Sequence, residues 1–292
     1  MSERRTASFY WLAALFTLFV LFLYGPMITI VLLSFQGPDG GLTFPMNGMS
    51  THWFGKLWEE GLPNVDIWAA FGRSLRLGLT VTVLTVVLSI LAGLAYRKRF
   101  RGSNALFFIV IASLIMPSIV VSLGIGLEFR LIDDLIRANA PAFITDGYTT
   151  AMGLFTSGIG AHLTWTLPFG LLIMFAIFNR FDGRFEEAAR DLGANPWQAF
   201  RHVVLPIIGP SIIGIALFGF TLSWDEIARS SQAIGYLNTL PLELQGQTTT
   251  VTTPVIYALG TLTTAVSILV IGSCLAAIVM IQSRRKALAK ST

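Results

Sequence analysis

The sequence predicts an all-α polytopic membrane protein with six transmembrane helices, and three observations carry this prediction. Of 292 residues, 54% are hydrophobic and only 12% are charged, whereas soluble chains carry about 25% charged residues. The mean hydropathy is +0.69. Apolar runs of the roughly 20 residues that a membrane helix needs recur at 9–34, 72–96, 105–128, 151–178, 204–224 and 251–281. We therefore expect a single transmembrane domain over residues 1–292.

The first run, 9–34, is too long for the apolar core of a signal peptide and lacks a clear small-x-small cleavage pattern. We expect an uncleaved anchor, kinked at Gly25-Pro26 because proline removes a backbone donor. The next stretch, 36–70, is rich in Gly, Pro and Trp. It is typical of an external loop with short interfacial helices.

Spans two and three each carry one irregular feature. Arg73 and Arg76 precede the uncharged stretch 77–96. They either reach the outer lipid headgroups, which we favour, or hold a ligand. Met116-Pro117 interrupts the third span, which leads into a charged stretch, 128–137, typical of an amphipathic helix on the outer surface.

Spans four and six contain the remaining unusual residues. His162 has no His, Cys or carboxylate nearby at metal-ligand spacing, so we favour a hydrogen-bonded packing residue over a ligand. The hydroxyls of 248–253 either satisfy carbonyls freed by Pro254 or line a polar path, and both interpretations stay open. Cys274, the sole cysteine, lies in the last span, so no intrachain disulfide can form.

Basic residues predict the orientation, because Lys and Arg concentrate on the cytoplasmic side of membrane proteins. With a cytoplasmic N-terminus, that side holds 14 of the 20 Lys and Arg, and both termini are cytoplasmic. The 14 are Arg4, Arg5, Arg97, Lys98, Arg99, Arg101, Arg180, Arg184, Arg190, Arg201, Arg284, Arg285, Lys286 and Lys290. The net charge of +4 thus reflects topology. Basic clusters that border spans do not indicate nucleic-acid binding.

A charged segment, 179–206, separates spans four and five on the predicted cytoplasmic side. The pattern predicts a short amphipathic helix that stops at Gly193 and a second helix that begins near Pro196. Charged residues lie beside apolar residues that can pack, namely Ala188, Ala189, Leu192, Trp197 and Phe200. We interpret the segment as a docking site for a soluble partner. The alternative is an ordinary polar loop.

Span five ends in Ser223-Trp224-Asp225-Glu226. Ionisable residues at membrane depth cost at least about 2.5 kcal/mol, which makes them functional candidates. Two carboxylates beside an indole suit an organic cation, since the acids supply charge and Trp224 a cation–π face. The alternative is an exposed helix end at which Arg229, four residues after Asp225, neutralises one acid. From the sequence, the cation site and the exposed helix end both stay open.

One long pattern resembles the cytoplasmic signature of permease subunits of ABC importers. It consists of Glu187-Ala188-Ala189, Gly193, Val203 and Leu205-Pro206. Together with 191–194, 220–226 and 240–242, the chain resembles the C-type inner-membrane subunit of spermidine/putrescine importers. This resemblance implies the type I importer permease fold, with a cytoplasmic coupling helix between helices four and five. It also implies ATP-driven import of a small cationic solute from periplasm to cytoplasm, by alternating access across the bacterial inner membrane.

The resemblance further implies the partners and the roles of residues. The partners are a second permease in a heterodimer, two ATPase subunits, a periplasmic substrate-binding protein, membrane lipid and the solute, with no nucleic acid. ATP and Mg would bind the ATPase subunits, since this chain has no G-x-x-x-x-G-K-[ST] loop and is not expected to be an enzyme. No catalytic residue, metal ligand or cofactor is expected in this chain. The ATPase-coupling residues would be Glu186, Glu187, Ala188, Ala189, Asp191 and Gly193. The substrate pathway would contain Trp224, Asp225 and Glu226.

Three alternatives remain, the first from the resemblance and the other two from the residues. The same importer class carries opines, amino-acid derivatives and other small solutes. An ion-coupled secondary carrier or channel would need carboxylates in several helices and repeated halves, and we find one acidic cluster and no repeat. An intramembrane enzyme would need a nucleophile–base pair or paired metal ligands, and His162 stands alone.

Overall fold

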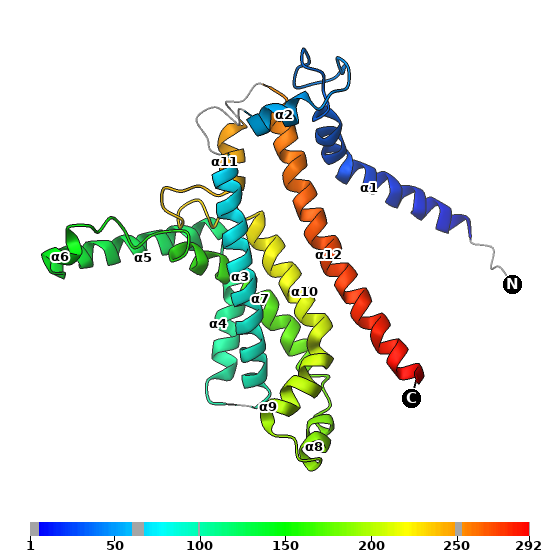
Figure 1. Ribbon diagram of the computed structural model, residues 1–292, viewed down its shortest axis with the longest axis vertical. Helices are drawn as coiled ribbons and strands as arrows, with labels where there is room; N and C mark the ends of the chain where they lie inside the picture. The colour runs from blue at the N-terminus through cyan, green and yellow to red at the C-terminus, as the bar shows by residue number, and fades with distance from the viewer. Residues whose placement is uncertain (1–5, 60–66, 99, 249–252, 292) are drawn as a thin grey trace. The chain divides into compact units, whose positions relative to one another are not determined.

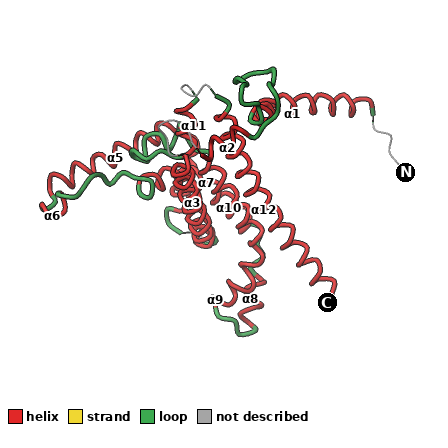
Figure 2. Tube along the Cα trace, turned by 45° about the horizontal axis from the view of Figure 1, so that its top comes forward, coloured by secondary structure: helices red, strands yellow, loops and turns green. Residues whose placement is uncertain are grey.

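The computed structural model describes residues 6–59, 67–98, 100–248 and 253–291, with side chains omitted at 278, 281, 282 and 284–291. This part of the chain consists of helices and loops (Figures 1 and 2), with one isolated antiparallel bridge between Gln36 and Met49. It forms two compact units. The first comprises Met1–Ile67 and Leu244–Val266, and the second Trp68–Glu243 and Ser267–Thr292.

The first unit contains α1 (Ala7–Leu33), α2 (His52–Glu59) and the beginning of α12 (Val255–Ser291). In α1, Leu33 is the one buried residue and apolar side chains are exposed all round, which is typical of a helix in lipid. The loop before α2 is fixed by Gln36, whose Oε1 accepts the N–H of Asn47 at 2.7 Å. The hydroxyl of Tyr257 donates to the carbonyl of Leu42 at 2.8 Å.

The core of the second unit is formed by α3 (Ile67–Tyr96), α7 (Ser157–Phe178) and α10 (Leu205–Trp224), side by side in Figure 1. A methyl group at Gly219 of α10 would lie 3.3 Å from the Cα of Thr82 in α3, so these helices approach backbone to backbone. The hydroxyls of Thr85 in α3 and Thr166 in α7 share a buried hydrogen bond of 2.7 Å. Small and hydroxyl residues at such contacts are typical of helices packed in a membrane.

The predicted interruption of the third span at Met116-Pro117 is confirmed, and the structure adds the size of the bend. This span forms α4 (Ser103–Ile115) and α5 (Ser118–Asn139), bent by 111° at the break between them. Met116 is extended, with ψ 136°, because the residue before a proline avoids the helical region. Figure 1 shows α5 extending sideways from the helices of its unit. The 13 residues of α4 rise about 20 Å, which is less than the hydrocarbon core of a bilayer.

Five described helical stretches are long and apolar enough to cross a membrane, and the bent pair makes a sixth if it counts as one span. The other elements are short: α6 (Ala142–Thr145), α8 (Arg184–Asp191), α9 (Pro196–Ala199), the π-helical turn η1 (Phe200–Val204) and α11 (Leu240–Gln247). Some predictions lie outside the described residues. These concern Arg4, Arg5 and Arg99, residues 249–252, and the side chains of Arg284, Arg285, Lys286 and Lys290.

Candidate functional site

The predicted helix stop at Gly193 is confirmed. Gly193 has a φ of 87°, a left-handed conformation that glycine adopts without strain. Its N–H donates to the carbonyl of Arg190 at 2.8 Å, and the N–H of Ala194 donates to that of Ala189 at 3.0 Å. These two bonds form a Schellman motif, which satisfies carbonyls that the end of α8 leaves free.

The predicted second helix is also confirmed, and it begins at Pro196 as α9. Asn195 caps it: its Oδ1 accepts the N–H of Gln198 at 2.9 Å, and the Oε1 of Gln198 accepts the N–H of Asn195 at 2.8 Å. This reciprocal pair is a capping box. From α9 the chain continues through η1 into α10, and α8 contacts both α9 and η1.

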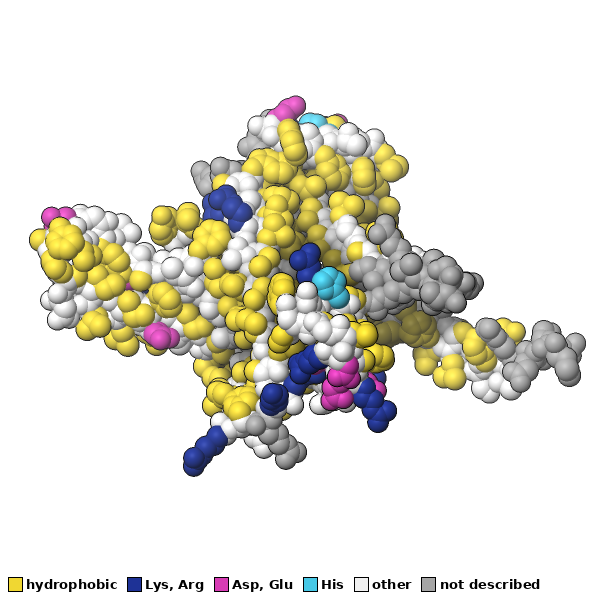
Figure 3. Space-filling model, turned by 60° about the horizontal axis from the view of Figure 1, so that its bottom comes forward, with side chains coloured by type: hydrophobic (Ala, Val, Ile, Leu, Met, Phe, Trp, Pro, Cys, Tyr) yellow, Lys and Arg dark blue, Asp and Glu magenta, His cyan; other side chains and the backbone are white. Residues whose placement is uncertain are grey.

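The coupling residues inferred from the resemblance lie together on α8 and at its end. Glu187, Ala188, Asp191 and Gly193 are exposed, whereas Glu186 and Ala189 are half-buried. Apolar side chains beside them are bare, since Leu192 is 89% and Trp197 64% exposed. Figure 3 shows charged side chains of both signs gathered with hydrophobic ones on this end of the unit. Exposed apolar groups rimmed by charge are typical of a protein–protein contact site.

An ion pair that the sequence analysis missed fixes α8 to the end of α3. Arg97, the residue after α3, donates to both carboxylate oxygens of Glu186, at 2.7 and 3.0 Å. Its guanidinium also lies 5.4 Å from the ring centre of Phe178 and 5.0 Å from that of Phe181. Such bidentate pairs have a defined geometry. Glu186 therefore holds α8 in place and leaves Glu187 exposed.

The acidic cluster lies just beyond α10, with three different environments. Asp225 is exposed and Glu226 is half-buried, with its Oε1 accepting the N–H of Arg229 at 2.8 Å. Trp224 is 2% exposed, and its ring lies 5.5 Å from those of both Phe71 and Phe220. The indole thus packs against two phenyl rings in this conformation. The pathway roles of these three residues stay predictions.

Arg229 does not turn toward Asp225. Its side chain is fully buried and donates to the hydroxyl of Thr164 and, at 3.2 Å, to the carbonyl of Ser113. The guanidinium lies 5.0 Å from the ring centre of Trp165. Among the described residues it forms no ion pair with Asp225, and its Nε has no hydrogen-bond partner. Local neutralisation of Asp225 by Arg229 is therefore not seen.

His162 is a hydrogen-bonded packing residue, as predicted. It is fully buried, with Nδ1 2.8 Å from the hydroxyl of Ser223 and Nε2 2.9 Å from that of Ser230. The proton of Ser230 is directed to the carbonyl of Glu226, at 2.8 Å, so Ser230 accepts from Nε2–H. Nδ1 then accepts from Ser223. The described residues contain no cluster of three potential metal ligands.

Other elements hold the segment 225–239 that carries the acids. Ser122 of α5 donates to the carbonyl of Arg229 at 2.9 Å, and Ser74 of α3 accepts the N–H of Leu240 at 2.8 Å. From α4 the carbonyl of Ser113 accepts a hydrogen bond from Arg229, and from α7 His162 bonds to Ser230. The segment is thus fixed from α3, α4, α5 and α7.

Residues 85–287 match the protein family described as "Binding-protein-dependent transport system inner membrane component". The putrescine transport system permease protein PotI of Escherichia coli (strain K12) is 31% identical over 255 residues, which cover 86% of this chain and 85% of PotI. The spermidine/putrescine transport system permease protein PotC of Haemophilus influenzae is 29% identical over 248 residues, which cover 85% of this chain and 88% of PotC.

Solved structures share the fold. A chain of a bacterial alginate ABC transporter, crystallised with an alginate-bound periplasmic protein, has a TM-score of 0.62 at 16% identity, covering 91% of this chain and 92% of that one. A chain of the MetNI methionine ABC transporter has a TM-score of 0.53 at 17% identity, and the match covers 74% of this chain and 94% of that one. The helical arrangement is thus that of ABC transporter membrane subunits.

Proposed function

Because the chain belongs to the family of binding-protein-dependent transport system inner membrane components, we propose that it is the permease subunit of an ATP-driven polyamine importer. It would move putrescine, spermidine or a similar cation from periplasm to cytoplasm. The surface of α8 and α9 is the observation that carries this proposal. An exposed Glu187 beside bare Leu192 and Trp197 suits the attachment of a soluble ATPase.

The complex we propose contains a second permease, two ATPase subunits and a periplasmic substrate-binding protein. Both termini of this chain would lie in the cytoplasm, which puts α8 on the side where ATP is available. ATP and Mg would bind the ATPase subunits, and this chain would carry out no chemistry. The solved alginate transporter with its bound periplasmic protein supports an assembly of this kind.

In the proposed mechanism, α8 lies in a groove on one ATPase subunit and follows it when the ATPases close on ATP. The bidentate contact of Glu186 with Arg97 links that movement to α3. Alternating access then follows as the permease pair opens to the other side. Asp225, an exposed carboxylate without an ion-pair partner among the described residues, would attract the ammonium groups of the solute.

A second candidate keeps the importer class and changes the solute to an opine or another amino-acid derivative. The stretch 237–253 favours it, because it is rich in Gln and Thr and contains one acid, Glu243. A stand-alone secondary carrier leaves the exposed surface of α8 and α9 without a role.

The deciding experiment measures ATP hydrolysis by the natively copurified complex in lipid, with its binding protein, across polyamines, amino acids and sugars. Stimulation by putrescine or spermidine is expected. Stimulation only by amino acids or sugars would support the assignment as an importer and reject a polyamine as its solute. Absence of any copurifying ATPase would reject the importer.

Glu187→Arg tests the docking surface. Glu187 is exposed, so the reversed charge should leave folding intact while transport is uncoupled from ATP hydrolysis, because α8 no longer fits its groove. Uptake and ATP hydrolysis are measured together in proteoliposomes. Arg130→Glu, on α5 and also exposed, is the matched control. Undiminished transport by Glu187→Arg would reject the docking assignment.

A further inference from the structure

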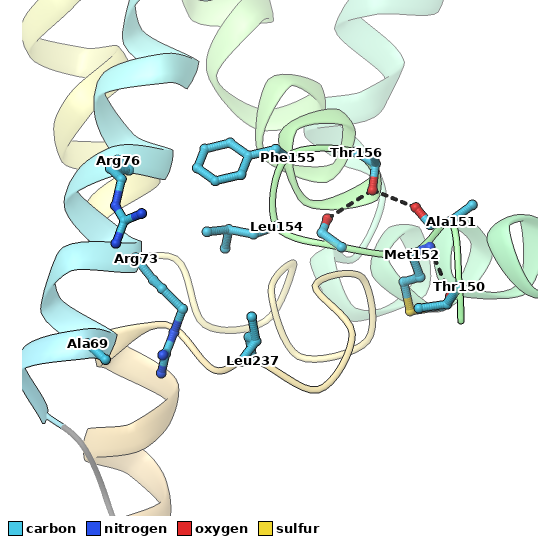
Figure 4. Close-up of a pocket in the computed structure, with 11 residues that line it drawn as sticks. Ala69, Arg73, Arg76, Thr150, Ala151, Met152, Leu154, Phe155, Thr156 and Leu237 are labelled. Carbon is cyan, nitrogen blue, oxygen red and sulfur yellow. Dashed lines mark hydrogen bonds between the residues drawn. The ribbon is translucent and has the colours of Figure 1, made fainter. Parts of the chain in front are cut away.

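A cavity of about 510 Å³ opens at the outer end of α3 in the second unit. One wall is α3, with Ala69, Arg73 and Arg76; the opposite wall is the segment 150–156 before α7, and Leu237 closes a third side. Figure 4 shows both arginine side chains extending from α3 toward this space. The volume lies within the range of ligand pockets, about 300–1,000 Å³.

The two arginines leave donors unused. Arg73 donates from Nε to the carbonyl of Asn238 at 2.8 Å, and Arg76 from Nε to that of Gly72 at 3.1 Å. Within the part of the chain that the structure describes, their terminal amino groups form no hydrogen bond or ion pair. The residues are three apart on a helix and therefore share a face. Two guanidinium groups thus offer free N–H groups to one cavity.

The opposite wall, as far as the structure describes it, contributes no charged side chain to the cavity. No carboxylate is among the described residues that line the cavity, and Asp133 behind its wall accepts hydrogen bonds from Thr150 and Ala151. The hydroxyl of Thr156 donates to the carbonyl of Ala151 at 2.6 Å, and that of Thr150 donates to Asp133 at 2.5 Å. Both hydroxyl protons are therefore already used. The charged side chains among the described lining residues are therefore both positive, and the guanidinium fork matches a carboxylate in shape and charge.

The walls favour a protein occupant over a lipid headgroup. An arginine that snorkels extends along apolar surface toward water. Arg73 instead bonds to the polypeptide between α10 and α11, and both guanidinium groups face a wall of the same chain. The segments around the cavity join spans on the predicted outer side, where a periplasmic protein would approach.

We propose that this cavity receives the carboxylate of an acidic side chain of the substrate-binding protein when that protein docks. The inference rests on the proposed function and on its orientation. Docking would insert the side chain between α3 and the segment 150–156 and pair it with Arg73 and Arg76. The cavity would thus contribute to the affinity of the binding protein and to its orientation.

The test uses the full complex in nanodiscs of zwitterionic phosphatidylcholine and measures ATP hydrolysis against binding-protein concentration. Arg73→Glu with Arg76→Glu should raise the half-saturating concentration at least about tenfold and leave the rate at saturation unchanged. Replacement of both by Lys should cost less, since charge remains. Arg130→Glu, which does not line the cavity, should behave as the unaltered protein. Reversal of one docking-face acid of the binding protein to Lys should restore affinity to the Glu variants.

Each of the following outcomes would contradict the proposed contact with the binding protein. An unchanged half-saturating concentration would reject it directly. A defect that appears only with anionic lipid would assign the arginines to headgroups. If the second permease is lost on purification, the two arginines belong to a subunit contact. If uptake is lost although the binding protein is saturating, they belong to the solute path. Absence of stimulation in the unaltered complex would reject the proposed function itself, which separates the two failures.

Discussion

At the scale of single residues, Asp225 and Glu226 are adjacent in sequence but not equivalent in structure. The carboxylate of Glu226 accepts the N–H of Arg229 and closes a turn, whereas Asp225 is exposed. Glu226 is therefore partly committed to the backbone. Asp225 is the acid that can meet a cation without first breaking a contact.

Neutralisation of the two acids should thus have unequal effects. Asp225→Asn is expected to lower the apparent affinity for polyamine about tenfold or more, because a charge-assisted contact is lost. Glu226→Gln should cost less, since an amide oxygen still accepts the N–H of Arg229, and the double variant should abolish uptake. Radiolabelled putrescine uptake in proteoliposomes measures this, with Asp134→Asn on α5 as control. Normal kinetics in the double variant would show that the cluster is only a helix end.

His162 should matter for stability, since its ring joins Ser223 to Ser230 in a buried site. His162→Ala leaves both hydroxyls without this partner and is expected to lower the free energy of unfolding by about 1–3 kcal/mol. His202→Ala, at an exposed position, is the control and should change little. Thermal unfolding in detergent compares the two, and equal melting temperatures would contradict the assignment.

Residues whose role is local were predictable, whereas those with distant partners were not. Gly193 and Pro196 follow from the chemistry of helix ends. One of the two open interpretations had Arg229 neutralise an acid four positions away, but its hydrogen-bond partners lie 65 and 116 residues away in sequence. Spacing alone carries no information about such contacts. The Arg97–Glu186 pair, 89 residues apart, escaped prediction for the same reason.

At the scale of elements, the contact between α8 and the end of α3 is an ion pair with two aromatic rings beneath it. Exposed ion pairs contribute about 0–1 kcal/mol to stability. The Arg97–Glu186 pair would therefore matter for the transmission of movement from α8 to α3 and not for folding.

Charge exchange tests this link. Glu186→Arg should lower the number of solute molecules imported per ATP hydrolysed, because α8 is repelled by Arg97. Addition of Arg97→Glu should restore much of this ratio, since the pair re-forms with reversed charges. Arg97→Glu should not restore this ratio in the Glu187→Arg variant. Equal ratios in the single and double variants would show that the contact transmits nothing.

Hydropathy located the spans, but it did not give the direction of the chain after the break in the third one. The run 204–224 corresponds to α10 (Leu205–Trp224), and 105–128 corresponds to α4 and the first part of α5. Hydropathy reports which residues tolerate lipid and not the direction of the backbone. The Met116-Pro117 break was visible in the sequence, but its 111° bend was not.

At the scale of the whole molecule, the proposed orientation puts the loop before α2 outside and α8 inside. In a Cys274→Ser background, a membrane-impermeant maleimide should label Asp39→Cys in intact spheroplasts but not Glu187→Cys, since both positions are exposed to solvent. Lysis should make residue 187 reactive. Labelling of residue 187 before lysis would invert the topology and remove the basis of the coupling assignment.

The close approach of α10 to α3 at Gly219 has a consequence for the route of the solute. With Gly219 near the backbone of Thr82, and Thr85 bonded to Thr166, there is no room for a solute between these helices. We infer that α3, α7 and α10 move as one rigid body. The translocation pore would then be bounded by the outer surface of this body, and one chain alone would form only part of its wall.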